Sequence, residues 1–314
     1  MIFHEPVLLR EVLEVLGPVS TEAVVDGTCG TGGHARELFR RVLPGGRLYC
    51  LDRDPQMLAI GAQRLKDEFR NETAAMSFHA IPYEKAGEVV PNGADVILID
   101  AGFNSLQIEH AERGFSFLKD GPLDARFNPA DGSRSVATLV NESREEDLAR
   151  WFHEYGEERH ARKAARAIVA RRRVKPFERT TELAELMVEV YPPKDRFGRI
   201  HPATRVFQSL RIVANDELGH VERGVRALIG LLNPGGRLAC ISFHSLEDRI
   251  VKQAFDEVAS PRPTPDDPYS ATSSEGIDFE IPSRRAIACS DEEAESNPRA
   301  RSAKLRVIRR KGGK

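Results

Sequence analysis

The chain has 314 residues, of which 40% are hydrophobic, and a formal net charge of −2. This length accommodates one large domain, or a core domain that carries an insertion, and the apolar content supports a sizeable core. No apolar run reaches the roughly 20 residues that span a bilayer, and the N-terminus lacks the basic and apolar segments of a signal peptide. The composition therefore argues against a membrane protein, and we expect a cytoplasmic one.

Apolar runs alternate with helical patterns along the first third of the chain. The predicted elements are, in order, a strand at 23–26, a helix at 34–42, a strand at 47–52, a helix from Pro55, and strands at 76–81 and 94–100. Proline suits the first turn of a helix, and short apolar runs between helical segments are typical of parallel strands. This alternation predicts an α/β fold with a doubly wound, mostly parallel sheet.

The alternation stops after Asp100, and helical patterns dominate until Gly236. Apolar side chains at the i, i+3, i+4 and i+7 positions of one helix are Leu148, Trp151, Phe152 and Tyr155. They define one face of a helix, and we expect Trp151 to pack in a core. A longer helical stretch is predicted at about 202–232, before a Pro-Gly-Gly turn at 234–236.

The strand pattern returns near the C-terminus. A fifth strand is predicted at 237–243, and the pattern at 302–310 indicates a closing edge strand. Between them, 261–276 is rich in Pro, Ser, Thr and Asp, a composition that buries little apolar surface. It predicts a mobile loop that cofactor binding does not need.

These patterns divide the chain into two parts. The strand-rich segments 1–107 and 215–314 are predicted to form one sheet domain, because their strands share the same parallel pattern. The helix-rich segment 108–214 is predicted to be an insertion in that domain.

Four cysteines occur in the chain: Cys29, Cys50, Cys240 and Cys289. They form no CxxC pair and have no metal-ligand spacing, so we expect no metal site. Cys50 and Cys240 lie inside apolar runs and are expected to be buried thiols. This usage is typical of a reducing cytoplasm.

A glycine-rich motif follows the first predicted strand. Residues 26–34 read Asp-Gly-Thr-Cys-Gly-Thr-Gly-Gly-His and lead into a helix. Glycine permits a sharp turn and the close approach of a ligand, and the helix N-terminus presents free N–H groups. Asp52 ends the second strand, where an acid can accept both hydroxyls of a ribose. The motif predicts a nucleoside-type cofactor, with a purely structural turn as the alternative.

Two cofactors are compatible with this motif. Residues 30–35 also satisfy G-x-G-x-x-A, the dinucleotide pattern. Two features favour S-adenosylmethionine. Asp26 stands four residues before Gly30, and the fourth strand ends in the sequence Asp-Ala-Gly-Phe at 100–103, comparable with the D-P-P-Y motif of amino-methyltransferases. Such a motif lies at the carboxyl edge of the sheet, beside the transferred methyl group.

Further motifs carry a resemblance to a known family. They lie at 4–9, 112–117, 120–124, 155–159, 201–208, 211–212, 241–249 and 297–306. Together they resemble the bacterial MraW-type family of 16S rRNA cytosine-N4 methyltransferases along nearly the whole chain. The resemblance implies a class I methyltransferase fold that is Rossmann-like, S-adenosylmethionine as cofactor, and 16S rRNA or the assembled small ribosomal subunit as partner. Whether the chain forms a homodimer is left open.

The resemblance also implies the cofactor contacts. By family motif these are Gly32, Gly33, His34, Asp52, Tyr83, Asp100 and Gln107. Tyr83 stands where the family usually has Phe. The chain departs from the family at 100–105, which reads DAGFNS in place of D-L-G-V-S-S, and at 122–127, which reads PLDARF in place of P-L-D-M-R-M.

Asp100 is the predicted catalytic residue. The exocyclic amine of cytosine is a poor nucleophile because its lone pair is delocalised into the ring. Our hypothesis is that Asp100 accepts a hydrogen bond from this amine and can receive its proton. The alternative is that Asp100 only ends a strand or binds cofactor. Side chains that could face or hold an unstacked base are Phe103, Phe115, Phe117, His201 and His244, each equally compatible with packing.

Basic residues concentrate in two stripes despite the nearly neutral total charge. Residues 159–179 hold nine basic side chains and one acid, and residues 299–314 hold eight basic side chains and no acid. Such stripes can neutralise RNA phosphates, so the insertion is predicted to recognise RNA, with Arg171, Arg172 and Arg173 gripping phosphates. The alternative is a solvated helix face and a frayed tail.

Two rival functions remain from the sequence alone. An NAD(P)-dependent oxidoreductase would need a hydride-transfer constellation, and no distinctive one is found. A non-catalytic rRNA-binding ribosome-assembly factor would explain the altered motif at 100–104.

Overall fold

The computed structural model describes residues 6–193, 196, 200–260 and 278–313. The chain forms two compact units. The sheet unit comprises Met1–Gly102 and Leu218–Lys314, and the helical unit comprises Phe103–Glu217. The segment 261–276, for which a mobile loop was predicted, lies outside the described residues.

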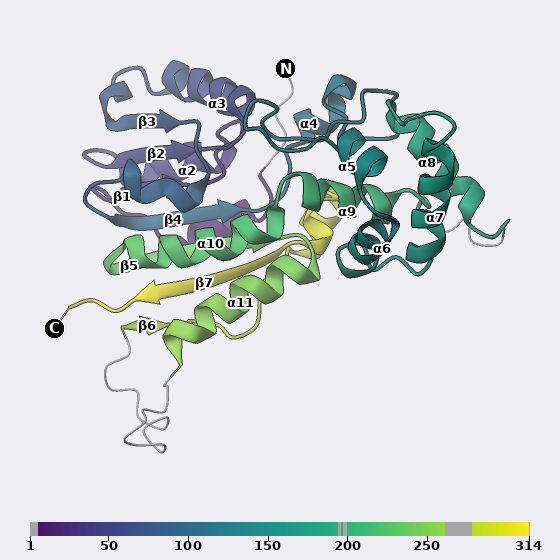
Figure 1. Ribbon diagram of the computed structural model, residues 1–314. Coiled ribbons are helices and arrows are strands. Elements are labelled where there is room, and N and C mark those ends of the chain that lie inside the picture. The colour runs from purple at the N-terminus through teal and green to yellow at the C-terminus, as the bar shows by residue number, and fades with distance from the viewer. Residues whose placement is uncertain (1–5, 194–195, 197–199, 261–277, 314) are drawn as a thin grey trace. The chain divides into compact units, whose positions relative to one another are not determined.

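A seven-stranded sheet organises the described part of the sheet unit (Figure 1). Its strands are β1 (Ala23–Asp26), β2 (Arg47–Leu51), β3 (Met76–His79), β4 (Ala94–Asp100), β5 (Leu232–Ser242), β6 (Phe279–Glu280) and β7 (Lys304–Arg310). Their order is β3-β2-β1-β4-β5-β7-β6, with β1 to β5 parallel and β7 antiparallel to both of its neighbours. This arrangement confirms the predicted doubly wound, mostly parallel sheet.

The last predicted strand was expected at the edge of the sheet, and this prediction is wrong. β7 lies between β5 and β6, pairing through Leu238↔Ile308 on one side and Phe279↔Arg310 on the other. The edge is β6, which is two residues long. A strand of two residues shows no hydrophobic alternation, so the sequence pattern could not reveal it.

The predicted turn before the fifth strand lies inside β5. Pairing with β4 shifts register between Ala94↔Leu232 and Val96↔Arg237, so the Pro-Gly-Gly segment is an irregularity within the strand. Gly235 has a φ of +84°, a left-handed conformation that favours glycine.

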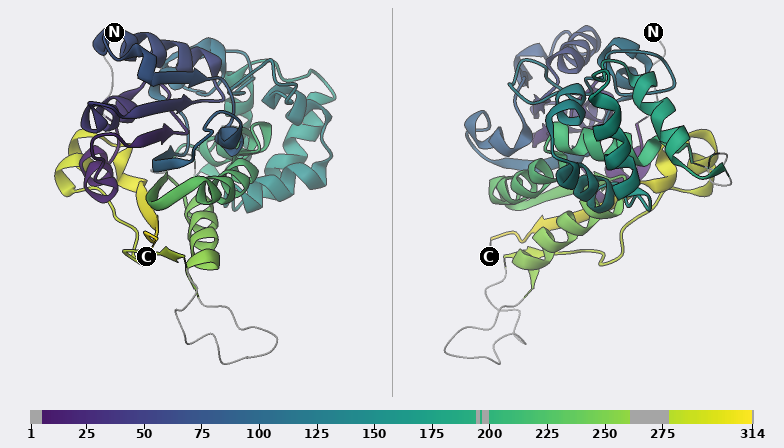
Figure 2. Two further views of the ribbon diagram at one scale, coloured as in Figure 1. Left: turned by 90° about the vertical axis from the view of Figure 1, so that its left-hand side faces the viewer. Right: turned by 45° about the vertical axis from the view of Figure 1, so that its right-hand side comes forward.

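Helices cover both faces of the sheet (Figures 1 and 2). The helices of this unit are α1 (Leu9–Leu16), α2 (Gly33–Val42), α3 (Pro55–Glu68), α10 (Glu217–Leu231, of which Glu217 belongs to the helical unit), α11 (Ser245–Ala259) and α12 (Asp291–Ser296), with 3-10 turns η1 (Thr73–Ala75), η2 (Tyr83–Glu88) and η6 (Ala300–Ser302). Along β4, Val96 and Leu98 join the core with α1 and α2, whereas Ile97 and Ile99 join the core with α10 and α11. Successive side chains of a strand point to opposite faces, so a nearly continuous apolar strand is buried on both.

The helical unit has a hydrophobic core of its own. Its helices are α4 (Ser105–Glu109), α5 (Val136–Glu142), α6 (Glu145–Glu154), α7 (Ala161–Arg172), α8 (Thr180–Val190) and α9 (Thr204–Ala214), with the 3-10 turn η3 (Ala111–Arg113). On α6, Leu148 and Phe152 are fully buried and Trp151 is partly buried against the same core, which confirms the predicted packing of Trp151. Tyr155 follows the helix as its C-cap and is half-buried. Over the described ranges, no helix is both long and apolar enough to cross a membrane.

The long helix predicted at 202–232 is wrong in one respect, because the structure has two helices there. α9 ends before Asn215, and Asp216 adopts a left-handed φ of +45°. The Asn215 side chain donates to the Ala125 carbonyl at 2.8 Å and accepts from the Phe127 N–H at 2.8 Å. These bonds to a loop distant in sequence stabilise the break between the two helices. The hydrophobic periodicity of the helical segment contains no information about such bonds.

Candidate active site

Three acids stand where three neighbouring strands end. Asp26 is the last residue of β1, Asp100 is the last of β4, and Asp52 follows β2 directly. Because β1, β2 and β4 are parallel and adjacent, their carboxyl ends meet at one edge of the sheet. The sheet order reverses between β1 and β4, and ligands of such sheets bind at that switch point.

The glycine-rich loop between β1 and α2 is tied to the strands on either side. The Gly27 N–H donates to the Leu98 carbonyl at 2.9 Å, and the Cys29 N–H donates to the Leu51 carbonyl at 2.9 Å. Gly32 is the N-cap of α2 with a φ of +78°. The loop therefore delivers the free N–H groups of the first turn of α2 to the same sheet edge.

Helix α3 packs directly on this loop through Gly61. A Cβ atom at Gly61 would lie 2.5 Å from the Gly30 carbonyl oxygen and 3.1 Å from the Gly32 nitrogen. Both neighbours are backbone atoms of the loop and cannot rotate away. The position consequently requires glycine.

We expect Gly61→Ala to lower cofactor affinity and to reduce the free energy of unfolding by roughly 1–3 kcal/mol, the usual cost of overpacking. Calorimetric titration and denaturant unfolding measure the two effects. Gly230→Ala in α10 is the matched control, since nothing lies within 4 Å of its added Cβ. That variant should gain about 0.5–1 kcal/mol of stability from helix propensity and keep its affinity. Unchanged affinity in Gly61→Ala would contradict the proposed loop geometry.

The Asp52 carboxylate supports the loop from the end of β2. Its Oδ2 accepts from the Gly30 N–H at 2.7 Å, and its Oδ1 accepts from the Asp54 N–H at 2.8 Å. Burial outweighs these bonds and raises the pKa of Asp52 to about 6. Each carboxylate oxygen has a second lone pair, so Asp52 can still accept the hydroxyls of a ribose.

Tyr83 opens η2 after β3 and is buried. A Cβ atom at Gly27 would lie 2.9 Å from the Tyr83 Cβ, and one at Gly224 in α10 would lie 2.0 Å from the Tyr83 ring. The neighbouring Glu84 accepts from His220 of α10 at 2.8 Å. Two glycines and a hydrogen bond thus place this aromatic ring beside the glycine-rich loop.

The His34 side chain is buried and faces two groups of the sheet unit. Its Nε2 lies 2.9 Å from the Val7 carbonyl oxygen, which can only accept, so Nε2 carries the hydrogen. Burial lowers the pKa of His34 and keeps the ring neutral. The unprotonated Nδ1 then lies 3.7 Å from Oδ2 of Asp100.

Asp100 has one carboxylate oxygen without a partner. Its backbone N–H donates to Oγ1 of Thr28 at 2.7 Å, while its Oδ1 is buried and has no hydrogen-bond partner among the residues described. Burial raises the pKa of Asp100 to about 7, and Arg299 opposes this effect. An unsatisfied buried acceptor costs roughly 1–3 kcal/mol, so a donor on a bound ligand would be favoured here.

The charge of the site distinguishes the two cofactors that the sequence allowed. Asp26 is buried as well, and burial raises its pKa to about 6. Together with Asp52 and Asp100 it would repel the pyrophosphate of a dinucleotide. A sulfonium cation with an ammonium group lowers the cost of keeping the three acids ionised. The residues therefore fit S-adenosylmethionine.

Gln107 belongs to the helical unit, whereas the other six predicted contacts belong to the sheet unit. Its Oε1 accepts from the Asn104 N–H at 2.7 Å, and Asn104 Oδ1 accepts from the Leu106 N–H at 3.0 Å. This reciprocal pair caps α4. Serine, which the family has at position 104, is also a good N-cap, so this departure keeps the local structure.

Phe103, another departure within the same motif, is accommodated by its own contacts. The Arg211 guanidinium lies 4.2 Å from the centre of the Phe103 ring, and Phe115 stacks at 6.4 Å. Arg211 is held in turn by two bonds to Glu217 at 2.8 and 2.9 Å. The altered motif is thus a packed arrangement and gives no reason to infer a lost activity.

The other aromatic candidates also pack within the helical unit. Phe115 lies 5.2 Å from Phe127, and Phe117 contacts both His201 and Phe207 at ring distances of 4.8 and 5.0 Å. The packing alternative therefore accounts for the contacts of these rings.

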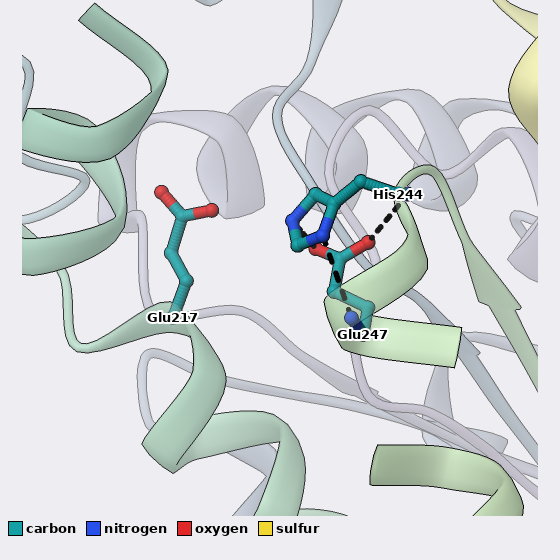
Figure 3. A group of neighbouring side chains, drawn as sticks. All are labelled: Glu217, His244 and Glu247. Atoms are coloured by element: carbon teal, nitrogen blue, oxygen red, sulfur yellow. Dashed lines mark hydrogen bonds and ion pairs between the residues drawn. The ribbon is translucent and has the colours of Figure 1, made fainter. Parts of the chain in front are cut away.

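His244 caps α11 (Figure 3). Its Nδ1 accepts from the Glu247 N–H at 3.4 Å, and its Nε2 lies 3.1 Å from Glu247 Oε1. Glu247 Oε2 accepts from the Phe243 N–H at 2.9 Å. Glu247 was not among the predicted site residues, although a polar residue three positions after a cap is a recognisable capping pattern.

Part of each basic stripe is bound within its own unit. Arg172 donates to the Val140 and Ser143 carbonyls, both at 2.7 Å, and the Arg171 guanidinium lies 5.0 Å from the Phe177 ring. In the C-terminal stripe, such bonds link Arg306 to Asp248, Arg309 to the Val15 carbonyl and Arg310 to the Leu232 carbonyl. These three arginines stabilise the fold, and that the C-terminal stripe neutralises phosphates stays a prediction.

Comparison with known proteins identifies the family. The model of the MraW methylase family matches residues 1–311. A protein named Ribosomal RNA small subunit methyltransferase H from Stenotrophomonas maltophilia is 45% identical, over 98% of this chain and 93% of its own length. Proteins of the same name from Magnetococcus marinus and Geobacter sulfurreducens are 42% and 44% identical, covering 98% and 97% of this chain and the same shares of their own. The chain therefore belongs to the MraW methylase family, as its motifs predicted.

Proposed function

We propose that the protein methylates the N4 amine of a decoding-site cytidine in 16S rRNA. Its family makes it a methyltransferase that uses S-adenosylmethionine, and its relatives are named as small-subunit rRNA methyltransferases. The observation that supports an amine as the methyl acceptor is the unpartnered buried oxygen of Asp100. An N–H of the substrate is the donor that this oxygen lacks.

The cofactor supplies an electrophilic methyl group on a sulfonium. Asp100 would accept a hydrogen bond from N4 and draw the lone pair of the amine out of the ring. Holding the amine in line with the methyl group is worth roughly 7–11 kcal/mol as effective molarity. After transfer, Asp100 would take the N4 proton, and a pKa of about 7 suits a group that must exist in both states near neutral pH.

His34 would stabilise the protonated state of Asp100. With its hydrogen fixed on Nε2 by the Val7 carbonyl, the ring offers only a lone pair at Nδ1 toward Oδ2 of Asp100. A neutral ring does not stabilise the ionised carboxylate as a salt bridge would. It can accept an O–H carried by Oδ2 of a protonated Asp100, which gives His34 a positioning role beside the cofactor contact that the family motif implies.

The remaining contacts divide between cofactor and substrate. Gly32, Gly33, Asp52, Tyr83 and Gln107 would hold S-adenosylmethionine, and the substrate would be 16S rRNA, free or in the assembled small subunit. The setting would be the cytoplasm, where ribosomal subunits are assembled.

Nucleoside mass spectrometry of small-subunit rRNA tests this function. Cells that lack the gene should lose N4-methylcytidine at the decoding site, and a plasmid copy of the wild-type chain should restore it. A plasmid copy that carries Asp100→Asn is the matched control and should not restore it. Unchanged N4-methylcytidine in the deletion strain would refute the proposed target.

A further inference from the structure

The exposed side of α7 carries several arginines. Arg162, Arg166 and Arg173 are separated by four and seven residues, and a helix turns about 100° per residue, so they lie within about 40° around its axis. Arg173 keeps right-handed helical dihedrals, with φ −67° and ψ −25°, so it continues the same face. Arg159, just before the helix, is exposed as well. We call these four residues the arginine ridge.

The opposite side of α7 fixes the direction in which the ridge points. Ala161, Ala164, Ala165 and Ile168 are buried in the core of the helical unit. The small side chains of the three alanines let the helix lie close to its neighbours. The arginine ridge therefore projects from a rigid element.

The ridge is not neutralised by the unit that carries it. Arg166 lies 3.8 Å from a Glu145 carboxylate oxygen, and the other three arginines make no hydrogen bond or ion pair with any residue that the structure describes. The remaining cations of the stripe behave differently. Lys175 pairs with Glu182 at 2.6 Å, and Arg179 pairs with Asp120 at 2.6 Å.

We propose that the arginine ridge binds backbone phosphates of the substrate RNA, an inference that rests on the proposed function. Three like charges on one helix face, with a fourth just before the helix, repel one another, because salt screens charges fully only beyond a Debye length of roughly 10 Å. An anionic polymer relieves that repulsion. Arginine forms bidentate bonds with phosphate. Such contacts position an RNA without reading its sequence. This proposal replaces the prediction that Arg171, Arg172 and Arg173 bind phosphates. Of these three residues, only Arg173 lies on the ridge.

The salt dependence of RNA binding measures this directly. Each phosphate contact on a single strand contributes about −0.7 to the slope of log affinity against log salt. Replacing all four ridge arginines with glutamine should make the slope shallower by up to about 2.8, and Arg162→Gln with Arg166→Gln by up to about 1.4. Filter binding of a 16S rRNA fragment that contains the decoding site, at several salt concentrations, gives the slopes.

Two controls separate a binding surface from general effects of charge or stability. Arg41→Gln with Arg47→Gln removes two exposed arginines of the sheet unit and should leave the slope unchanged. Arg172→Gln removes bonds to two carbonyls, so it should lower the melting temperature and keep the slope. The ridge variants should keep their cofactor affinity by calorimetry, raise KM for RNA and leave kcat at saturating RNA unchanged.

The outcomes distinguish this proposal from the proposed function. If every variant methylates the fragment and the ridge variants keep the wild-type salt slope and RNA affinity, the proposed role of the ridge is refuted and the proposed function is retained. A shallower slope in the ridge variants, without N4-methylcytidine from the wild-type enzyme, would support the ridge and refute the function. Ridge-dependent binding to vesicles of anionic lipid with an unchanged RNA slope would also overturn the proposal.

Discussion

Replacing Asp100 with asparagine should lower the rate of methyl transfer by about 100- to 10,000-fold, the range for losing a group that handles a proton. Asparagine keeps a similar shape and an acceptor oxygen, so the fold should be retained, but it cannot take the N4 proton. Single-turnover methyl transfer to the decoding-site RNA fragment, at saturating cofactor, measures this loss.

Asp95 provides the matched control because it stands on the same strand at the opposite end. Its Oδ2 accepts from the Ala23 N–H at 2.9 Å, and its Oδ1 accepts from Asn233 at 2.9 Å. Asp95→Asn should therefore lower stability and leave the rate of transfer unchanged. Full RNA methylation by Asp100→Asn would refute the role assigned to Asp100.

The raised pKa of Asp100 also predicts how stability depends on pH. Its pKa is 3.8 in the unfolded chain and about 7 in the folded one, so the folded state favours the protonated form. The stability from this group is present at low pH and is lost as pH rises through about 7. In the cofactor-free protein, Asp100→Asn should have a higher melting temperature than wild type at pH 8, with little difference at pH 4. A lower melting temperature at pH 8 would contradict the burial of this carboxylate.

Loss of the Asp52 carboxylate should weaken cofactor binding by about 10- to 100-fold, because charged hydrogen bonds of roughly 1.5–3 kcal/mol disappear. Calorimetric titration of Asp52→Ala with S-adenosylmethionine measures the change, and RNA affinity should stay the same. Equal cofactor affinity would show that the ribose does not lie at this position.

Asp52 also holds the Gly30 and Asp54 N–H groups, so a loose loop could imitate a lost ribose contact. A 2′-deoxyribose analogue of the cofactor separates the two effects. Wild type should prefer the natural ribose, whereas Asp52→Ala should bind both compounds equally. Asp54→Ala, which removes the N-cap of α3, should cost about 1 kcal/mol of stability and keep the preference for ribose.

Much of the sheet unit followed from the sequence alone. Parallel strands that alternate with helices must bring their carboxyl ends to one edge, so acids at 26, 52 and 100 could be grouped without coordinates. The glycine-rich loop was equally accessible, because glycine spacing after a strand is a local signal that backbone conformation explains. The family motifs added Tyr83 and Gln107, for which local patterns gave no argument.

Only the tertiary structure decided the features that depend on contacts between distant residues. The place of β7 inside the sheet depends on pairing with the two residues of β6, and the break after α9 depends on bonds from Asn215 to a loop about ninety residues earlier. Similarly, Arg172 and Arg173 are adjacent and identical in sequence, yet only Arg172 has carbonyl oxygens of another helix within reach. Sequence determines which charges a segment carries, whereas packing against remote backbone determines which of them remain available to a ligand.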